Sequence, residues 1–199
     1  MNVNTYLKSE EIEKLRSVRI GIGGAGGLGS NAAAHLVRAG VEQFVIADFD
    51  TVCESNLNRQ FFFRDQLGMP KVEALAENLR RINPDVKLEL HNTRITAENI
   101  HEIFDCCDLF LEAFDAADSK TLFVRELLPL GRPVVAASGL AGWGRSNAMQ
   151  VRKVGKNLYL AGDLTSEIGG ELTPQSARVG IGAAQEANTA LALILGREI

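Results

Sequence analysis

The chain has 199 residues, 46% of them apolar, with 21 Lys and Arg against 25 Asp and Glu, for a net charge of −4. This length and composition suit one globular domain with a substantial core, and the acidic balance argues against a nucleic-acid partner, which usually meets a basic stripe. No apolar run is long enough to span a membrane and no secretory signal precedes the first charged residues, so we expect a single domain over 1–199 in the cytoplasm.

Helices and strands are expected to alternate from the start of the chain. Ser9 stands where it could cap a first helix over 10–16. A buried strand over 18–23 then runs into a glycine-rich turn. In chain order we next expect a helix over 28–39, a strand over 44–47, a helix over 71–82, a strand over 86–90, a helix over 97–104, a strand over 109–113, a helix over 118–128 and a strand over 133–137.

The last part of the chain has a different pattern. Segments 148–152 and 157–160 read as a hairpin around Gly155, segment 161–178 as a long loop, and 183–195 as a closing helix. Alternating strands and helices require crossover connections and a mainly parallel sheet. The pattern therefore predicts an α/β fold, a Rossmann-like three-layer sandwich whose mainly parallel sheet carries a C-terminal antiparallel extension.

The cysteines do not form a metal or disulfide framework in the sequence. Cys53, Cys106 and Cys107 make no C-x-x-C pair, and the vicinal two can hardly bridge each other. The three histidines are scattered. We therefore expect no zinc site, and expect the thiols to be buried or half-buried structural groups.

A glycine pattern joins the first strand to the second helix. Gly24, Gly26 and Gly29 form G-x-G-x-x-G there, and Asp48 ends the next strand. Such glycines allow a tight turn and close backbone approach to phosphate at a helix N-terminus, while the acid can accept hydrogen bonds from ribose hydroxyls. The alternative is that the glycines only let helix and strand pack closely. The pattern alone does not distinguish NAD, FAD and ATP.

Polar and charged residues follow Asp48 at the same sheet edge: Asp50, Asn56, Arg59, Gln60 and Lys71. Ligands bind at the carboxyl edge of open α/β sheets. A dinucleotide dehydrogenase has no evident need of an arginine and a lysine there, whereas a triphosphate requires its charge to be neutralised. Taken singly, each charge could be a solvated surface residue; together they favour ATP.

Four segments in unbroken order carry a specific resemblance: GAGGLGS (24–30), D-x-D-x-V…S-N-L-x-R-Q (48–60), G-x-P-K (68–71) and EAFDAADSK (112–120). On these motifs, within 18–137, the chain resembles the ThiF/MoeB/HesA family, bacterial relatives of ubiquitin-activating enzymes, and within it the short ThiF sulfur-carrier adenylyltransferases. The last segment departs from the family's D-x-x-D-N-x-x-x-R, with Glu112, Ala116 and Lys120 in place of Asp, Asn and Arg.

The resemblance implies a role for each matched position. Asp115 would hold Mg²⁺ through the phosphates, and with Arg59 and Lys71 it would form the catalytic set; its alternative role is to cap the following helix, as Asp118 also could. The implied nucleotide-binding set is Gly24, Gly26, Gly29, Asp48, Asn56, Arg59, Gln60 and Lys71.

The resemblance also implies a reaction. It is the ATP-dependent adenylation of the C-terminal Gly-Gly carboxylate of a ubiquitin-like sulfur carrier, ThiS-like, in thiamine biosynthesis, by a homodimer working with a separate sulfur donor. Segment 138–199 would bind the carrier, whose tail would run beneath the loop 161–178, unless that loop is a disordered surface segment. The loop contains no cysteine, so a covalent cysteine-linked step is not supported. Two alternatives stay open: a tRNA-modifying dehydratase of the same family, and a non-catalytic nucleotide-binding Rossmann module.

Overall fold

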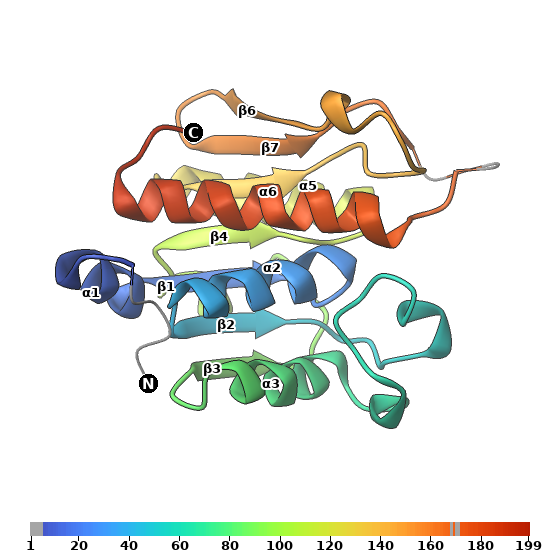
Figure 1. Ribbon diagram of the computed structural model, residues 1–199, viewed down its shortest axis with the longest axis horizontal. Helices are drawn as coiled ribbons and strands as arrows, with labels where there is room; N and C mark the ends of the chain where they lie inside the picture. Colours follow the sequence, from blue (N-terminus) through green and yellow to red (C-terminus); the bar gives the residue numbers. More distant parts are fainter. Residues whose placement is uncertain (1–5, 168, 170–171) are drawn as a thin grey trace.

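The computed structural model describes residues 6–167, 169 and 172–199. Its centre is a seven-stranded sheet in the order β3-β2-β1-β4-β5-β7-β6, drawn edge to edge in Figure 1. Neighbouring strands pair in parallel except β6 and β7, which form the antiparallel hairpin. The strands are β1 Arg19–Gly23, β2 Gln43–Ala47, β3 Lys87–His91, β4 Leu109–Glu112, β5 Val134–Ala137, β6 Gln150–Val154 and β7 Leu158–Gly162.

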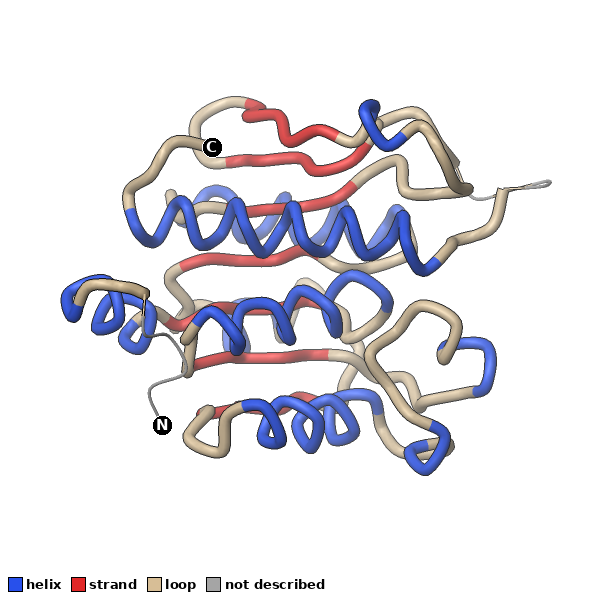
Figure 2. The backbone as a smooth tube through the Cα atoms, in the orientation of Figure 1, coloured by secondary structure: helices blue, strands red, loops and turns tan. Residues whose placement is uncertain are grey.

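Helices cover both faces of the sheet, which makes three layers (Figure 2). On one face α2, α3 and α6 pack side by side (Figure 1). On the other face α5 packs with α4 in the second core cluster. The predicted fold class is therefore confirmed. The helices are α1 Ser9–Ser17, α2 Gly27–Ala39, α3 Lys71–Ile82, α4 Ile100–Phe104, α5 Ala117–Leu127 and α6 Ser176–Leu195, with short 3-10 turns η1 Glu54–Asn56, η2 Arg64–Gln66, η3 Leu128–Leu130 and η4 Ser146–Ala148.

The central strands are buried on both faces, as expected for a parallel sheet. Ile22 and Leu111 point into the core beneath α2 and α6. Phe110 points into the second core, where the Phe123 ring of α5 meets Phe104 edge to face at 5.2 Å between ring centroids. Packing on both faces fixes where the strands end, and so fixes the carboxyl edge of the sheet.

Three element predictions are corrected by the structure. The helix expected over 97–104 is only Ile100–Phe104, and α6 begins at Ser176 rather than at 183. Segment 176–182 looked aperiodic because glycines interrupt its apolar pattern; Gly182 has a packing reason, since a Cβ there would lie 2.8 Å from Leu140. Ser9 is the first helical residue rather than the cap: Lys8 holds the N-cap position and its N–H donates to Glu11 at 2.9 Å.

The thiols also differ from expectation. Cys107 is buried, but Cys53 and Cys106 are exposed. Burial raises the pKa of the Cys107 thiol above its usual range, which makes it unreactive. Within the described part of the chain, no helix is both long and apolar enough to cross a bilayer.

Candidate nucleotide site

The carboxyl ends of β2, β1 and β4 meet at a cavity of about 150 Å³. Such a position, where neighbouring strands connect in opposite directions, is where open α/β sheets bind ligands. Six residues singled out from the sequence line it: Gly24, Gly26, Asp48, Asp50, Lys71 and Asp115. Four others of that set do not, namely Gly29, Asn56, Arg59 and Gln60.

The turn between β1 and α2 requires glycine for two different reasons. Gly24 has φ +99°, and a Cβ there would lie 2.7 Å from the Ala113 carbonyl oxygen. A Cβ on Gly29 would lie 1.9 Å from the Gly24 carbonyl oxygen, so Gly29 allows helix and strand to pack closely. Gly26 holds the N-cap position of α2 and offers no capping side chain. The first turn of α2 is thus open to a ligand that accepts hydrogen bonds.

Asp48 is fixed at the end of β2 by the neighbouring backbone. Its carboxylate accepts the N–H groups of Ala25 at 2.7 Å and Asp50 at 2.8 Å. Burial raises the pKa of this carboxyl, and the two N–H groups and the Lys71 ammonium oppose that rise. Each carboxylate oxygen has a second lone pair, so Asp48 can still accept hydroxyl donors from the cavity.

Lys71 brings a positive charge to the same cavity. It is the first residue of α3, is 6% exposed, and its Nζ lies 2.7 Å from Oδ2 of the half-exposed Asp50. An ammonium has three donors, and this ion pair uses one. The arrangement keeps a desolvated cation ready for a second, anionic partner.

Arg59 lies beside the glycine turn but outside the cavity. Segment 54–61 is docked on α2, where Asn31 donates to the Arg59 carbonyl oxygen at 2.9 Å and the Phe61 N–H donates to Ser30 at 3.0 Å. The guanidinium donates to the Ser55 carbonyl oxygen at 3.2 Å and to Asn58 at 2.8 Å. The convergence of Arg59 with Lys71 and Asp115 that the sequence predicts is therefore not present, because local acceptors hold the guanidinium.

Asn56 and Gln60 are both buried, with different surroundings. Asn56 accepts the Cys53 N–H at 3.0 Å and so closes the η1 turn. The Gln60 amide nitrogen would lie 3.8 Å from a Cβ on Gly26, and its Oε1 has no hydrogen-bond partner within the described ranges. A buried acceptor of this kind needs a donor from a bound molecule or from ordered water. Gln60 thus supports a ligand at the glycine turn.

Asp115 is exposed at the cavity in the β4–α5 loop. It does not cap α5, since Ala116 holds the N-cap position and no side chain caps it, so Asp118 is not the cap either. The residues that the structure describes contain no cluster of three or more His, Cys, Asp or Glu that could hold a metal ion. A single carboxylate beside phosphates is nevertheless a usual arrangement for Mg²⁺.

Seven cavity residues were given no role from the sequence: Phe49, Thr93, Arg94, Ala113, Phe114, Ala116 and Ser119. The Arg94 guanidinium lies 4.1 Å from the Phe49 ring centroid and forms a cation–π pair on the cavity wall. Thr93 and Arg94 follow β3 within three residues. The rule that ligands gather at carboxyl ends of strands would have found them had it been applied to this strand also.

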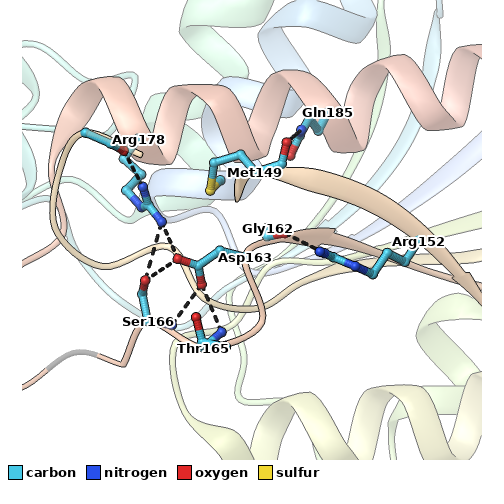
Figure 3. A network of polar contacts seen from close by, with 9 residues as sticks. Met149, Arg152, Gly162, Asp163, Thr165, Ser166, Arg178 and Gln185 are labelled. Atoms are coloured by element: carbon cyan, nitrogen blue, oxygen red, sulfur yellow. Dashed lines mark hydrogen bonds and ion pairs between the residues drawn. The ribbon is translucent and has the colours of Figure 1, made fainter. Parts of the chain in front are cut away.

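The segment after β7 is held by a buried ion pair rather than forming one long loop to 178. Figure 3 shows Arg178 of α6 facing Asp163, whose carboxylate also accepts the N–H groups of Thr165 at 2.9 Å and Ser166 at 2.8 Å. Arg178 also donates to the Gly144 carbonyl oxygen at 2.6 Å. Burial alone would raise the pKa of Asp163, but the hydrogen bonds from Ser166 and Thr165 and the guanidinium hold it well below its usual range.

Curated relatives match between about half and most of the chain. Adenylyltransferase and sulfurtransferase UBA4 of Lodderomyces elongisporus is 36% identical over 183 residues, which cover 87% of this chain and 40% of the relative. Ubiquitin-like modifier-activating enzyme 5 of Xenopus laevis is 42% identical over 97 residues, covering 48% of this chain and 24% of the relative. The chain thus spans less than half of the length of these relatives.

Solved structures share the fold. Escherichia coli tRNA N6-threonylcarbamoyladenosine dehydratase, TcdA, in complex with ATP superposes with a TM-score of 0.86 at 21% identity, covering 94% of this chain and 90% of that one. Escherichia coli MccB with ATP gives 0.73 at 20% identity, covering 94% and 58%. The model of the ThiF family matches residues 1–189. On that match, the protein belongs to the ThiF family.

Proposed function

We propose that the protein adenylates the C-terminal Gly-Gly carboxylate of a ubiquitin-like sulfur carrier, using ATP and Mg²⁺. The observation that carries the proposal is the shared cavity of Asp48, Lys71 and Asp115 beside the uncapped start of α2. Membership of the ThiF family supports it, as do relatives named adenylyltransferase and ubiquitin-like modifier-activating enzyme. A ThiS-like carrier in thiamine biosynthesis is the finer form of the proposal.

In the proposed reaction a carboxylate oxygen of the carrier bonds to the α-phosphorus of ATP. The bond from that phosphorus to the bridging oxygen breaks, and pyrophosphate leaves with its electron pair. The attacking carboxylate is already ionised at neutral pH, so no general base is needed. Catalysis then reduces to positioning and to stabilising charge on the phosphates.

The cavity residues singled out from the sequence have places in this scheme. Asp48 would accept the ribose hydroxyls, and the α2 N–H groups together with Gly24 and Gly26 would meet the phosphates. Lys71 would exchange part of its contact with Asp50 for the phosphates. Asp115 would hold Mg²⁺, which neutralises charge as pyrophosphate departs. Arg59 could join only by leaving its contacts with Ser55 and Asn58.

The carrier would approach along the carboxyl edge. Residues 163–167 follow β7 at this edge and are tied down by the contact of Asp163 with Arg178 (Figure 3). We propose that the carrier's extended tail runs beneath the loop 161–178, of which residues 168, 170 and 171 lie outside the described part of the chain. We assign 138–199 to carrier binding and 18–137 to the nucleotide. A homodimer and a separate sulfur donor complete the proposal.

A second function is favoured by one comparison. The chain covers 90% of the dehydratase TcdA but only 40% of UBA4 of Lodderomyces elongisporus. A dehydratase acting on a modified tRNA would use the same nucleotide cavity to activate a small carboxyl group. The net charge of −4 weighs against a tRNA partner.

The two functions separate in an ATP–pyrophosphate exchange assay run with three additions: a carrier ending in Gly-Gly, the same carrier lacking that dipeptide, and tRNA. Exchange that requires the intact carrier supports carrier adenylation, and exchange with tRNA alone supports the dehydratase. Calorimetry with Mg·ATP and NAD forms the third arm. Nucleotide binding without exchange in any mixture would indicate a non-catalytic module and overturn the proposal.

A further inference from the structure

Glu112 ends β4 directly before the loop that carries Asp115. Its side chain is 2% exposed, and its Oε1 accepts the N–H of Phe114 at 2.8 Å. Phe114 is the residue before Asp115, so this hydrogen bond fixes the backbone on which the cavity carboxylate stands. Glu112 itself does not line the nucleotide cavity.

Lys120 of α5 ties the same carboxylate to the next strand. Its Nζ donates to Oε1 of Glu112 at 3.1 Å, to Oε2 at 3.0 Å and to the Ala137 carbonyl oxygen at 3.1 Å. All three ammonium donors therefore point inward. Ala137 ends β5, so the lysine joins the ends of β4 and β5 to the first turns of α5. Like Glu112, it lies outside the nucleotide cavity.

A second buried acid, Glu186, lies near this pair but makes no hydrogen bond to Lys120 in the described part of the chain. Glu186 of α6 is fully buried, and neither of its carboxyl oxygens has a hydrogen-bond partner in the described part of the chain. Burial and the neighbouring charge of Glu112 raise its pKa well above the usual range, which favours its neutral form. Within the described ranges, Lys120 is the cation in contact with Glu112, and its loss would leave a buried carboxylate unpaired.

The other side of the loop is held by separate contacts. The Phe114 ring meets the Phe123 ring of α5 at 5.6 Å between centroids, and the Ala113 N–H donates to the Gly23 carbonyl oxygen at 2.8 Å. These contacts hold 113 and 114 against β1 and α5. In the described part of the chain, the Glu112 carboxylate joins the loop, through Lys120, to β5.

We propose that Glu112 and Lys120 are positioning residues that set Asp115 for the divalent cation of the bound nucleotide. This inference rests on the proposed function for the role of Asp115. Partners that orient a metal-binding group commonly change metal affinity or activity by about 10- to 100-fold when they are removed. The pair should therefore act on Mg²⁺-dependent binding and leave Mg²⁺-free nucleotide binding unchanged.

The test is calorimetry of ATP binding with Mg²⁺ and with a chelator, on the full chain and on two α5 variants. Lys120→Met removes the buried pair, and Arg125→Met removes an exposed ion pair with Glu126 on the same helix. We expect Lys120→Met to bind Mg·ATP about tenfold more weakly, with Mg²⁺-free ATP binding unchanged, and Arg125→Met to match the wild type. Wild-type preference for Mg·ATP retained in Lys120→Met would overturn the inference.

A length exchange tests the geometry without removing charge, and serves also if Lys120→Met does not fold. Glu112→Asp shortens the acid by one methylene, and Lys120→Arg replaces the base by a longer planar group. Each alone should weaken Mg·ATP binding, and the double variant should recover most of the loss because the pair closes again. A double variant no better than the weaker single one would contradict the pairing. If the wild type binds no nucleotide in either condition, the proposed function fails instead.

Discussion

The part of the molecule around the glycine turn, 18–137, and the part after β5, 138–199, reach their geometry by different means. Around β1, β2 and β4 the cavity is built by residues at strand ends and helix starts, and Asp48 accepts the N–H groups of Asp50 and of Ala25 in the glycine turn. Beyond β5 the edge is held by the contact of Asp163 with Arg178, with Gly144 added from a third segment. The residues of the first site belong to short motifs that can be recognised in the sequence. The partners of the second belong to no motif and are found only in the folded chain.

The largest expected effect comes from breaking the ion pair of Asp163 with Arg178. Asp163→Ala leaves the buried Arg178 guanidinium without its counter-charge, which should lower the free energy of unfolding by about 3–5 kcal/mol. Glu10→Ala removes an exposed pair with Lys14 and should change it by less than about 1 kcal/mol. Chemical denaturation at pH 7 measures both.

The pKa of Asp163 adds a pH dependence to the same measurement. Because the folded-state pKa lies below that of the unfolded chain, its stabilisation is present above about pH 4 and is lost as the pH falls through the folded-state value. The wild type should therefore approach Asp163→Ala in stability under acid. Equal loss at every pH would show that the charge pair is not the cause.

Lys71→Ala, in contrast to Asp163→Ala, should lower activity more than it lowers the stability of the fold. A lost preorganised cation at the phosphates costs about 3 kcal/mol of transition-state stabilisation, or roughly a hundredfold in exchange rate. Arg59→Ala should cost less, because the guanidinium is held by Ser55 and Asn58 outside the cavity. Steady-state exchange kinetics on both variants sharpen the comparison, and an equal or larger loss for Arg59→Ala would mean that this side chain turns into the site.

The smallest expected effect concerns Glu186. Its raised folded-state pKa means that the folded chain keeps a proton that the unfolded chain loses above about pH 4.3, so this acid destabilises the protein increasingly as the pH rises. Glu186→Gln should thus be more stable than the wild type at pH 8 and similar to it near pH 4. Thermal unfolding across that range checks the sign, and a variant less stable at pH 8 would contradict it.

The same contrast explains which parts of the fold and the site could be predicted from the sequence. The bounds of α3, the carboxyl edge and the meeting of Asp48 with Lys71 there followed from short patterns, because strand ends and helix starts are encoded locally. Asp115 was added by the family resemblance. The position of the Arg59 side chain could not be predicted in this way, because it depends on which nearby acceptors its guanidinium binds. The start of α6 was missed because glycines interrupt the apolar pattern of 176–182, and because the buried partner of Arg178 is known only from the fold.

The most direct test is ATP–pyrophosphate exchange by the wild-type chain with a carrier ending in Gly-Gly, measured beside Lys71→Ala. We predict exchange that requires both the carrier's dipeptide and Mg²⁺, and that falls about a hundredfold in the variant. Exchange at the wild-type rate in Lys71→Ala would contradict the assignment of the cavity to the triphosphate.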